Sequence, residues 1–92
     1  MSIVVRFKPT NLTTERYNES IRRLKEAGDF PPEGCELHVF FGDEGNLHVS
    51  EIWDSREHLE GFGEKLMPIL ADLGIGFSGE PDIYEVQNLI QR

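Results

Sequence analysis

Apolar and polar residues alternate along three stretches of the chain, which is the pattern of a β-strand with one buried face. The first stretch runs from Ile3 to Lys8 and ends before Pro9. The other two cover residues 37–41 and 47–53 and flank a Gly-Asp-Glu-Gly-Asn turn. We therefore expect an N-terminal strand and, later in the chain, a β-hairpin.

The register of this hairpin decides which side chains share a face of the sheet. Odd-numbered residues of both strands lie on one face if the numbers of each pair sum to an even number, as for Phe41 opposite Leu47, unless a bulge intervenes. In that register His38 lies opposite or diagonal to Ser50. We therefore expect His38 and His48 to share the face that points away from the odd-numbered apolar residues.

Two other stretches have apolar residues at spacings of three and four, which is typical of amphipathic helices. The first follows a possible cap at Thr13 or Thr14 and stops at Gly28. The second follows a possible cap at Asp54 or Ser55. Pro68 falls inside the second pattern, and we expect it to kink or break the helix near residues 64–67, because proline lacks a donor and crowds the carbonyl four residues back.

The remaining segments are a loop with two prolines at residues 29–34, a glycine-rich connection at residues 74–79 and a last strand at residues 82–89. The order of elements is therefore βαββαβ within a single domain, residues 1–92. Right-handed crossovers place both helices on one side of the sheet. The sequence thus predicts an α+β fold of the ferredoxin-like type, with an antiparallel four-stranded sheet.

The second face of this sheet has no helix to cover it. Its predicted apolar residues are Val4, Phe40, Ile52, Tyr84 and Val86. A set of this size exceeds the scattered apolar exposure of an ordinary monomer. We therefore expect a homodimer in which two such faces meet.

Composition limits the other partners. The 92 residues include 17 acidic and 9 basic side chains, a formal net charge of −8 that repels phosphate backbones and anionic membranes. No apolar run approaches the roughly 20 residues that cross a bilayer. Cys35 has no partner for an internal disulfide, and no charged-then-apolar leader precedes the first strand. We expect a reduced, cytoplasmic protein that binds neither nucleic acid nor membrane.

Residues 51–62, Glu-Ile-Trp-Asp-Ser-Arg-Glu-His-Leu-Glu-Gly-Phe, and residues 65–70, Lys-Leu-Met-Pro-Ile-Leu, carry a family resemblance. Together with the element order, they resemble the dimeric α+β barrel superfamily that includes antibiotic-biosynthesis monooxygenase-like proteins. The resemblance implies a cavity between the helices and the sheet of each subunit. The superfamily contains cofactor-independent oxygenases, haem-degrading enzymes, small cyclases, isomerases and many members with no established activity. The resemblance does not choose among them, because the matching residues mainly build structure.

The enzymatic branches of that superfamily fit this chain unequally. Trp53 matches a strand-three tryptophan of several branches, but the haem-degrading branch adds a first-strand asparagine where this chain offers Arg6. His58 lies in the first helical turn, too early to reach a haem iron. Close-spaced metal-ligand motifs are also lacking. We therefore expect no cofactor and no metal, while Arg6, Trp53 and Tyr84 could serve a cofactor-independent oxygenase.

The histidines are candidates for acid–base chemistry. His38 and His48 stand on neighbouring strands and the same predicted face, and Ser50, Tyr84 and Arg6 could complete a polar cluster there. Histidine titrates near neutral pH, which suits general acid–base catalysis. The alternative is that both histidines line a dimer interface or a partly wet interior and only satisfy hydrogen bonds.

Glu51 is the strongest single exception to the apolar pattern, because the strand period places it on the otherwise apolar face. A carboxyl group held among apolar side chains suits proton transfer. Glu85, at a similar position on the last strand, could be its companion. The alternative is that Glu51 pairs with Arg6 or Lys8.

The sequence therefore predicts a small homodimeric α+β barrel protein that binds a small apolar or aromatic molecule between sheet and helices, as a cofactor-independent monooxygenase or an isomerase. The catalytic candidates are Glu51, His38, His48 and Tyr84, and the substrate-binding candidates are Trp53, Phe7, Phe62 and Arg6. The alternative is a non-catalytic dimerisation or ligand-sensing module, in which these polar residues satisfy one another.

Overall fold

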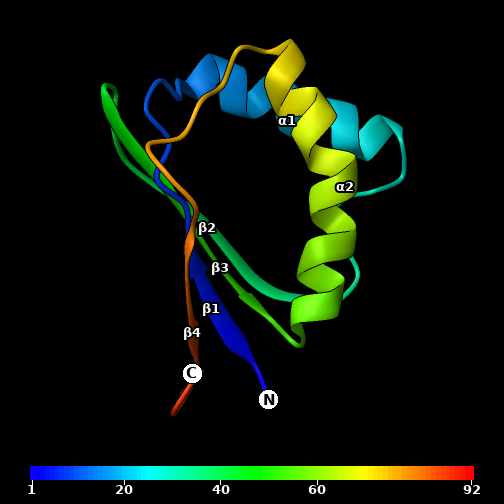
Figure 1. Ribbon diagram of the computed structural model, residues 1–92, viewed down its shortest axis with the longest axis vertical. Coiled ribbons are helices and arrows are strands. Elements are labelled where there is room, and N and C mark those ends of the chain that lie inside the picture. Colours follow the sequence, from blue (N-terminus) through cyan, green and yellow to red (C-terminus); the bar gives the residue numbers. More distant parts are fainter.

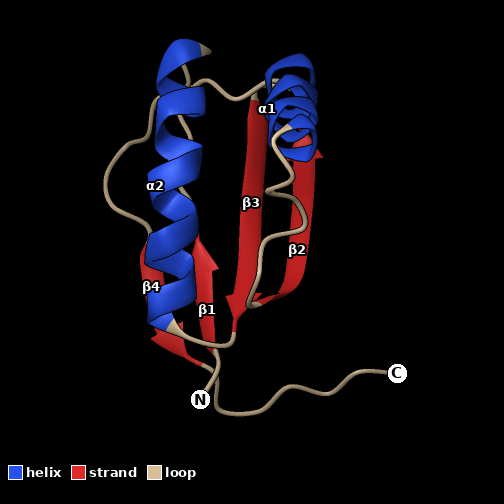
Figure 2. Ribbon diagram, turned by 90° about the vertical axis from the view of Figure 1, so that its right-hand side faces the viewer, coloured by secondary structure: helices blue, strands red, loops and turns tan.

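The predicted order of strands and helices is present in the computed structural model, which describes residues 1–92. The elements are β1 (Ile3–Arg6), α1 (Thr14–Glu26), β2 (Cys35–Asp43), β3 (Asn46–Trp53), α2 (Arg56–Asp72) and β4 (Asp82–Glu85). The four strands form one antiparallel sheet in the order β2-β3-β1-β4. Both helices cover the same face of this sheet and leave the other face open (Figures 1 and 2). The predicted ferredoxin-like α+β fold is confirmed.

Side-chain caps begin both helices where the sequence predicts them. The Thr13 hydroxyl accepts a hydrogen bond from the Arg16 amide at 3.1 Å, and the Ser55 hydroxyl accepts one from the His58 amide at 3.2 Å. Each cap satisfies an amide of the first helical turn that has no partner within the helix. Neither helix is long and apolar enough to cross a bilayer.

The last two elements differ in extent from the prediction. Helix α2 runs without interruption through Pro68 to Asp72, so the break expected near residues 64–67 does not occur. Proline removes the donor that would meet the Glu64 carbonyl, and Glu64 is exposed, so water can take the place of that donor. Strand β4 ends at Glu85 instead of residue 89, because neighbouring β1 begins at Ile3. One more backbone hydrogen bond follows, from the Val86 amide to the Ser2 carbonyl at 3.0 Å.

The hairpin register also differs from the prediction. Strands β2 and β3 extend to Asp43 and Asn46, which leaves a two-residue loop closed by Gly45 at φ +90°, a backbone angle that glycine adopts without strain. This shorter loop shifts the pairing by one residue. His38 therefore pairs with Glu51, instead of lying opposite or diagonal to Ser50. A one-residue shift moves every side chain of β2 to the other face of the sheet.

A β-bulge at Glu36 limits this exchange of faces. Cys35 pairs with Trp53 and Leu37 pairs with Ile52, so two steps along β2 match one step along β3. Cys35 consequently packs against the core. Beyond the bulge, the odd-numbered apolar residues of β2 lie on the open face and are exposed, against the prediction that they meet the helices. They are Leu37, Val39 and Phe41.

The core fills the space between the sheet and the two helices. Trp53 is fully buried and its ring lies 5.5 Å from that of Phe62 on α2. The buried cluster consists of Ile3, Val5, Leu24, Trp53 and Phe62. Trp53 is thus the central packing residue that joins β3 to α2.

Candidate site on the helix side of the sheet

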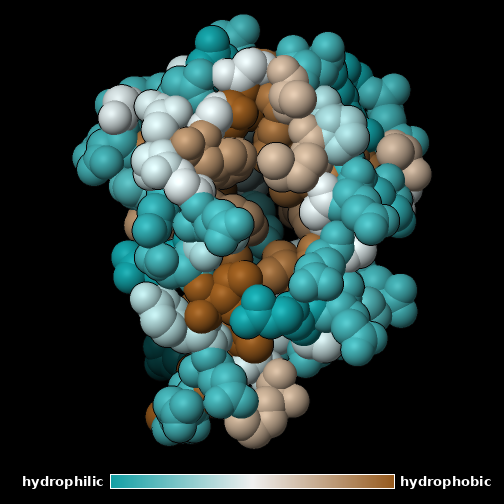
Figure 3. Space-filling view, viewed as in Figure 1, coloured by the Kyte–Doolittle hydropathy of each residue, from teal (hydrophilic) through white to brown (hydrophobic).

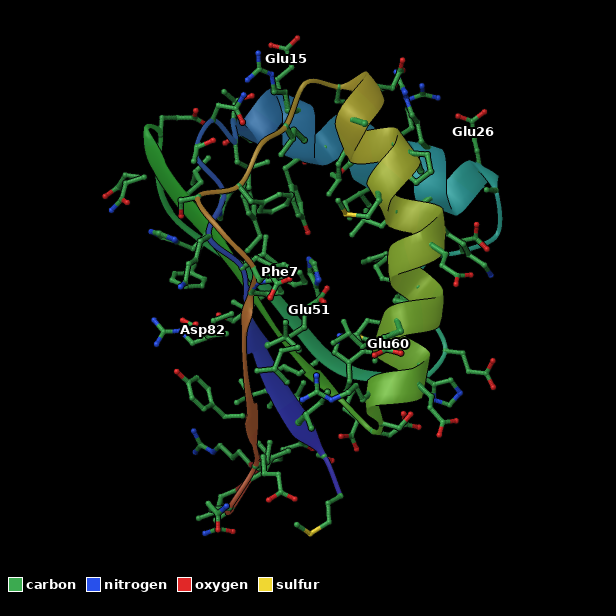
Figure 4. The ribbon with its side chains drawn as sticks, viewed as in Figure 1. Phe7, Glu15, Glu26, Glu51, Glu60 and Asp82 are labelled. Carbon is green, nitrogen blue, oxygen red and sulfur yellow. The ribbon has the colours of Figure 1, made fainter.

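A buried carboxylate lies at the centre of the candidate site. Glu51 stands on β3 between β2 and β1, and is only 3% exposed. One oxygen, Oε2, lies 2.6 Å from Nδ1 of His38, and the other, Oε1, accepts a hydrogen bond from the Trp53 indole N–H at 3.0 Å. In Figure 4 Glu51 projects from the sheet toward the helices. Its burial is possible because both oxygens have partners.

His38 links this carboxylate to a tyrosine on the helix layer. Its Nε2 lies 2.7 Å from the hydroxyl of Tyr17 on α1. A carboxylate only accepts hydrogen bonds, so a neutral His38 carries its proton on Nδ1 and offers Nε2 as the acceptor for the Tyr17 hydroxyl. The result is a continuous hydrogen-bonded relay from Trp53 through Glu51 and His38 to Tyr17.

Aromatic packing holds the outer end of this relay in place. The Tyr17 ring stacks on Phe40, with ring centres 3.8 Å apart and an angle of 2° between the planes. Phe30 and His38 pack edge to face, with ring centres 5.6 Å apart and an angle of 88° between the planes. Partial burial, followed by the charge of Glu51, raises the pKa of Tyr17. The phenol therefore remains protonated at neutral pH.

The outer end of the relay faces a groove of about 500 Å³ between α1, the proline loop and β2. The lining residues are Tyr17, Ile21, Lys25, Phe30, Pro31, Pro32, Cys35, Glu36, Leu37 and His38. Tyr17, Ile21 and Lys25 are spaced by four residues and so line up along one face of α1. The groove is large enough for a small aromatic molecule and exposes only the Tyr17–His38 end of the relay to it.

The molecule is also hollowed between the sheet and the helices. Figure 3 shows this recess with apolar surface gathered around it. Figure 4 places Phe7 and Glu51 on the sheet side of the same space. Apolar walls are therefore present on the helix side of the sheet, where the sequence predicts the ligand.

Only two of the four catalytic candidates come together. Glu51 and His38 are direct partners across the β2–β3 ladder. The prediction that His38 shares a face with His48 is wrong, because the shorter hairpin loop shifts β2 by one residue. His48 lies beside Phe41, with ring centres 5.5 Å apart. Tyr84 pairs with Val4 across the β1–β4 ladder and is 57% exposed.

The substrate-binding candidates are also divided between the two faces. Arg6 is exposed and pairs in register with Ser50, so it takes no part in the relay. Trp53 and Phe62 belong to the packed core and do not line the groove. Phe7 is half-buried, and its ring lies 6.3 Å from that of Phe77.

Like Arg6, the other two residues considered as neighbours of Glu51 lie elsewhere. Glu85 is exposed at the end of β4, and Lys8 pairs with Asp82 at 3.2 Å. Glu51 instead takes its hydrogen bonds from His38 and Trp53. The hydrogen-bond partners of the buried carboxylate are therefore a histidine and an indole, which the strand pattern did not predict.

Tyr17 is the site residue that the sequence analysis missed. It lies on the apolar stripe of α1, where its ring contributes to packing and its hydroxyl carries no signal of its own. A hydroxyl-bearing residue on the buried face of a helix was the available clue, since such a group needs a hydrogen-bond partner. The identity of that partner depended on the β2 register.

Cys35 also lines the groove but does not have the properties of a nucleophile. Burial, followed by the charge of Glu51, raises the pKa of its thiol to about 11. The reactive form of cysteine is the thiolate, which is scarce at neutral pH under these conditions. No group of three or more histidine, cysteine or acidic side chains is arranged to hold a metal ion.

No protein-family model matches the sequence, and no curated protein matches it. Solved structures do match the fold. A candidate antibiotic biosynthesis monooxygenase from Deinococcus radiodurans aligns over 100% of this chain and 98% of its own, with 16% identity and a TM-score of 0.61. A variant of SnoaB, a cofactor-independent oxygenase from Streptomyces nogalater, aligns over 99% of this chain and 96% of its own, with 14% identity and a TM-score of 0.59.

A designed protein shares the same fold. Foldit4, designed de novo, aligns over 95% of this chain and 100% of its own, with 17% identity and a TM-score of 0.61. This chain therefore has the α+β fold of the antibiotic biosynthesis monooxygenase-like proteins, and that fold also forms without a natural function. Any activity must be argued from the side chains of the site.

Proposed function

We propose that this chain is a homodimeric enzyme that removes a proton from a small aromatic or otherwise apolar molecule, as a cofactor-independent monooxygenase or an isomerase. The observation that carries the proposal is the contact of 2.6 Å between His38 Nδ1 and the buried Glu51 carboxylate, next to an apolar groove. A histidine oriented by a carboxylate is a common general base.

The chemistry follows from the hydrogen bonds of His38. Glu51 holds the proton on Nδ1, so Nε2 is the basic nitrogen. When Nε2 takes up a proton, the imidazolium lies beside the Glu51 carboxylate, which stabilises the new charge. The burial of Glu51 keeps water away from this carboxylate and so strengthens the interaction. Together these features favour removal of a weakly acidic C–H proton.

The carbanion left after this step has two outcomes. Return of the proton to a different carbon is an isomerisation. Reaction with dioxygen is an oxygenation, in which a CH₂ group and O₂ give a carbonyl group and water. The shared fold of SnoaB, a cofactor-independent oxygenase, supports the second outcome without deciding it.

The homodimer is part of the proposal because the open face of the sheet is apolar. Leu37, Val39 and Phe41 follow each other at alternate positions of β2, and each is more than 40% exposed. The register shift adds them to Val4, Ile52 and Tyr84 on this face. It also moves Phe40, predicted here, to the helix side, where it stacks on Tyr17. A second copy of the same face would bury this row.

Deuterium exchange tests the proposed chemistry without knowledge of the natural substrate. The protein in D₂O is mixed with 2-indanone, 2-tetralone or phenylacetone, and the loss of the acidic C–H signal is followed by NMR. We expect faster exchange than in buffer, reduced about 100-fold in His38→Gln. Oxygen uptake then separates oxygenation from isomerisation. Exchange at the buffer rate for all three ketones would overturn the proposal.

A second candidate function is a non-catalytic ligand-sensing module. It is favoured by the fact that no buried polar side-chain atom lacks a hydrogen-bond partner, so the relay is complete without a substrate. In that case the three ketones bind, as followed by shifts of groove resonances, but exchange does not exceed the buffer rate.

A further inference from the structure

We propose that Tyr17 is the catalytic residue that touches the substrate, and that its hydroxyl passes the substrate's proton to Nε2 of His38. This inference rests on the proton abstraction proposed above. It differs from that proposal in naming the group that meets the substrate and in assigning a role to the helix layer.

Tyr17 occupies the basic nitrogen of His38. Its hydroxyl lies 2.7 Å from Nε2. The His38 side chain is only 19% exposed, so little of it remains open to a substrate. A molecule in the groove therefore finds this nitrogen already hydrogen-bonded to the Tyr17 hydroxyl.

Tyr17 is also held rigidly in this position. Its ring stacks on Phe40 with centres 3.8 Å apart, and the next turn of α1 adds Ile21 to the same groove wall. Displacement of the ring would break the aromatic stack and the hydrogen bond together. A fixed hydroxyl that remains in place is favoured over a side chain that swings aside.

The proton transfers balance without any further reactant. The substrate C–H proton passes to the Tyr17 oxygen while the Tyr17 O–H proton passes to Nε2, so the phenol is neutral before and after the step. The products are a substrate carbanion and a His38 imidazolium beside the Glu51 carboxylate. The raised pKa of Tyr17 agrees with this role, because partial burial and the Glu51 charge both disfavour a free phenolate.

Tyr17→Phe tests the inference, because it removes the hydroxyl and keeps the ring that stacks on Phe40. We expect the exchange kcat for 2-indanone to fall about 100-fold while KM stays unchanged. The matched control is Tyr84→Phe, which removes a hydroxyl from the opposite, open face and should leave exchange unchanged. Circular dichroism and thermal unfolding verify that both variants fold.

The outcomes separate this inference from the proposal on which it rests. Loss of exchange in both Tyr17→Phe and His38→Gln supports the relay. Loss in His38→Gln alone, with Tyr17→Phe unchanged or faster, overturns the role of Tyr17 and retains His38 as the base. A His38→Gln variant as active as the unmodified protein, or an unmodified protein without exchange, overturns both.

Discussion

His38 and Glu51 are direct partners across the β2–β3 ladder, and their side chains meet at 2.6 Å on the helix side of the sheet. Taken singly, a histidine on an edge strand and a buried glutamate on a central strand can each have a structural role. Their contact is informative because it lies between a buried indole and a groove-facing phenol.

Glu51→Gln should reverse the tautomer of His38. The new amide oxygen can accept from the Trp53 indole, and its NH₂ group then donates to His38 Nδ1, so the ring proton moves to Nε2. We expect unfolding free energy to change by about 1 kcal/mol or less, because no group loses its hydrogen bond. Histidine ¹⁵N NMR reports the tautomer. Exchange activity should be lost with the basic Nε2, and an unchanged tautomer would contradict this account.

The pair of His58 and Asp54 at the start of α2 should make stability depend on pH. Their contact of 2.7 Å is the main cause that raises the pKa of His58 and lowers that of Asp54. The stabilisation that comes from the raised pKa of His58 is fully present below pH 6.5, the ordinary pKa of histidine. It is lost as the pH rises through the raised pKa. The stabilisation that comes from the lowered pKa of Asp54 is fully present above pH 3.8, the ordinary pKa of aspartate. It is lost as the pH falls through the lowered pKa.

Thermal unfolding of the unmodified protein and of Asp54→Asn measures this effect. We expect the difference in Tm to be largest near about pH 5, where both partners are charged, and to shrink toward about pH 8. Both side chains are solvent-accessible, so added salt should reduce the difference. A difference that stays constant across this range would show that the ion pair contributes nothing.

Gly34→Ala should destabilise the protein more than Gly45→Ala does. Both glycines have positive φ angles, +86° and +90°, so both variants share a backbone cost of about 1–2 kcal/mol. A Cβ at Gly34 would collide with the His58 side chain, whereas nothing lies within 4 Å of one at Gly45. Urea unfolding of the two variants isolates the contact between the proline loop and α2. Equal losses of stability would show that His58 moves aside freely.

Val39→Glu should convert the proposed dimer to a monomer. Val39 is exposed in the middle of the apolar row on the open face, and a carboxylate buried there against its symmetry mate would lack a partner. Met67→Glu is the matched control, because Met67 is an exposed apolar residue on α2. Light scattering at micromolar concentration should give a dimer for the unmodified protein and for Met67→Glu. A monomeric unmodified protein would remove the dimer from the proposal.

Local patterns were sufficient for the elements and for the burial of Glu51. Alternation marked the strands, and the caps at Thr13 and Ser55 marked the helix starts, because both signals depend on neighbours within a few residues. The position of Glu51 on the same face as Val49 and Trp53 also follows from a local signal, because side chains of a strand alternate between faces with a period of two residues. The sequence by itself therefore determined the order βαββαβ, the position of both helices on one side of the sheet and the placement of one acid among apolar residues.

The partners of Glu51 were decided only by the tertiary structure. The hairpin loop has two residues instead of five, and this change of register brought His38 under α1 and moved Leu37 to the open face. Tyr17 entered the site because α1 lies across that part of β2. A strand can be shifted by one residue without altering its own alternation, so the alternation of apolar residues does not distinguish the two registers. The contacts that the observed register makes, from Glu51 to His38 and from His38 to Tyr17, join three separate elements and become visible only in the folded chain.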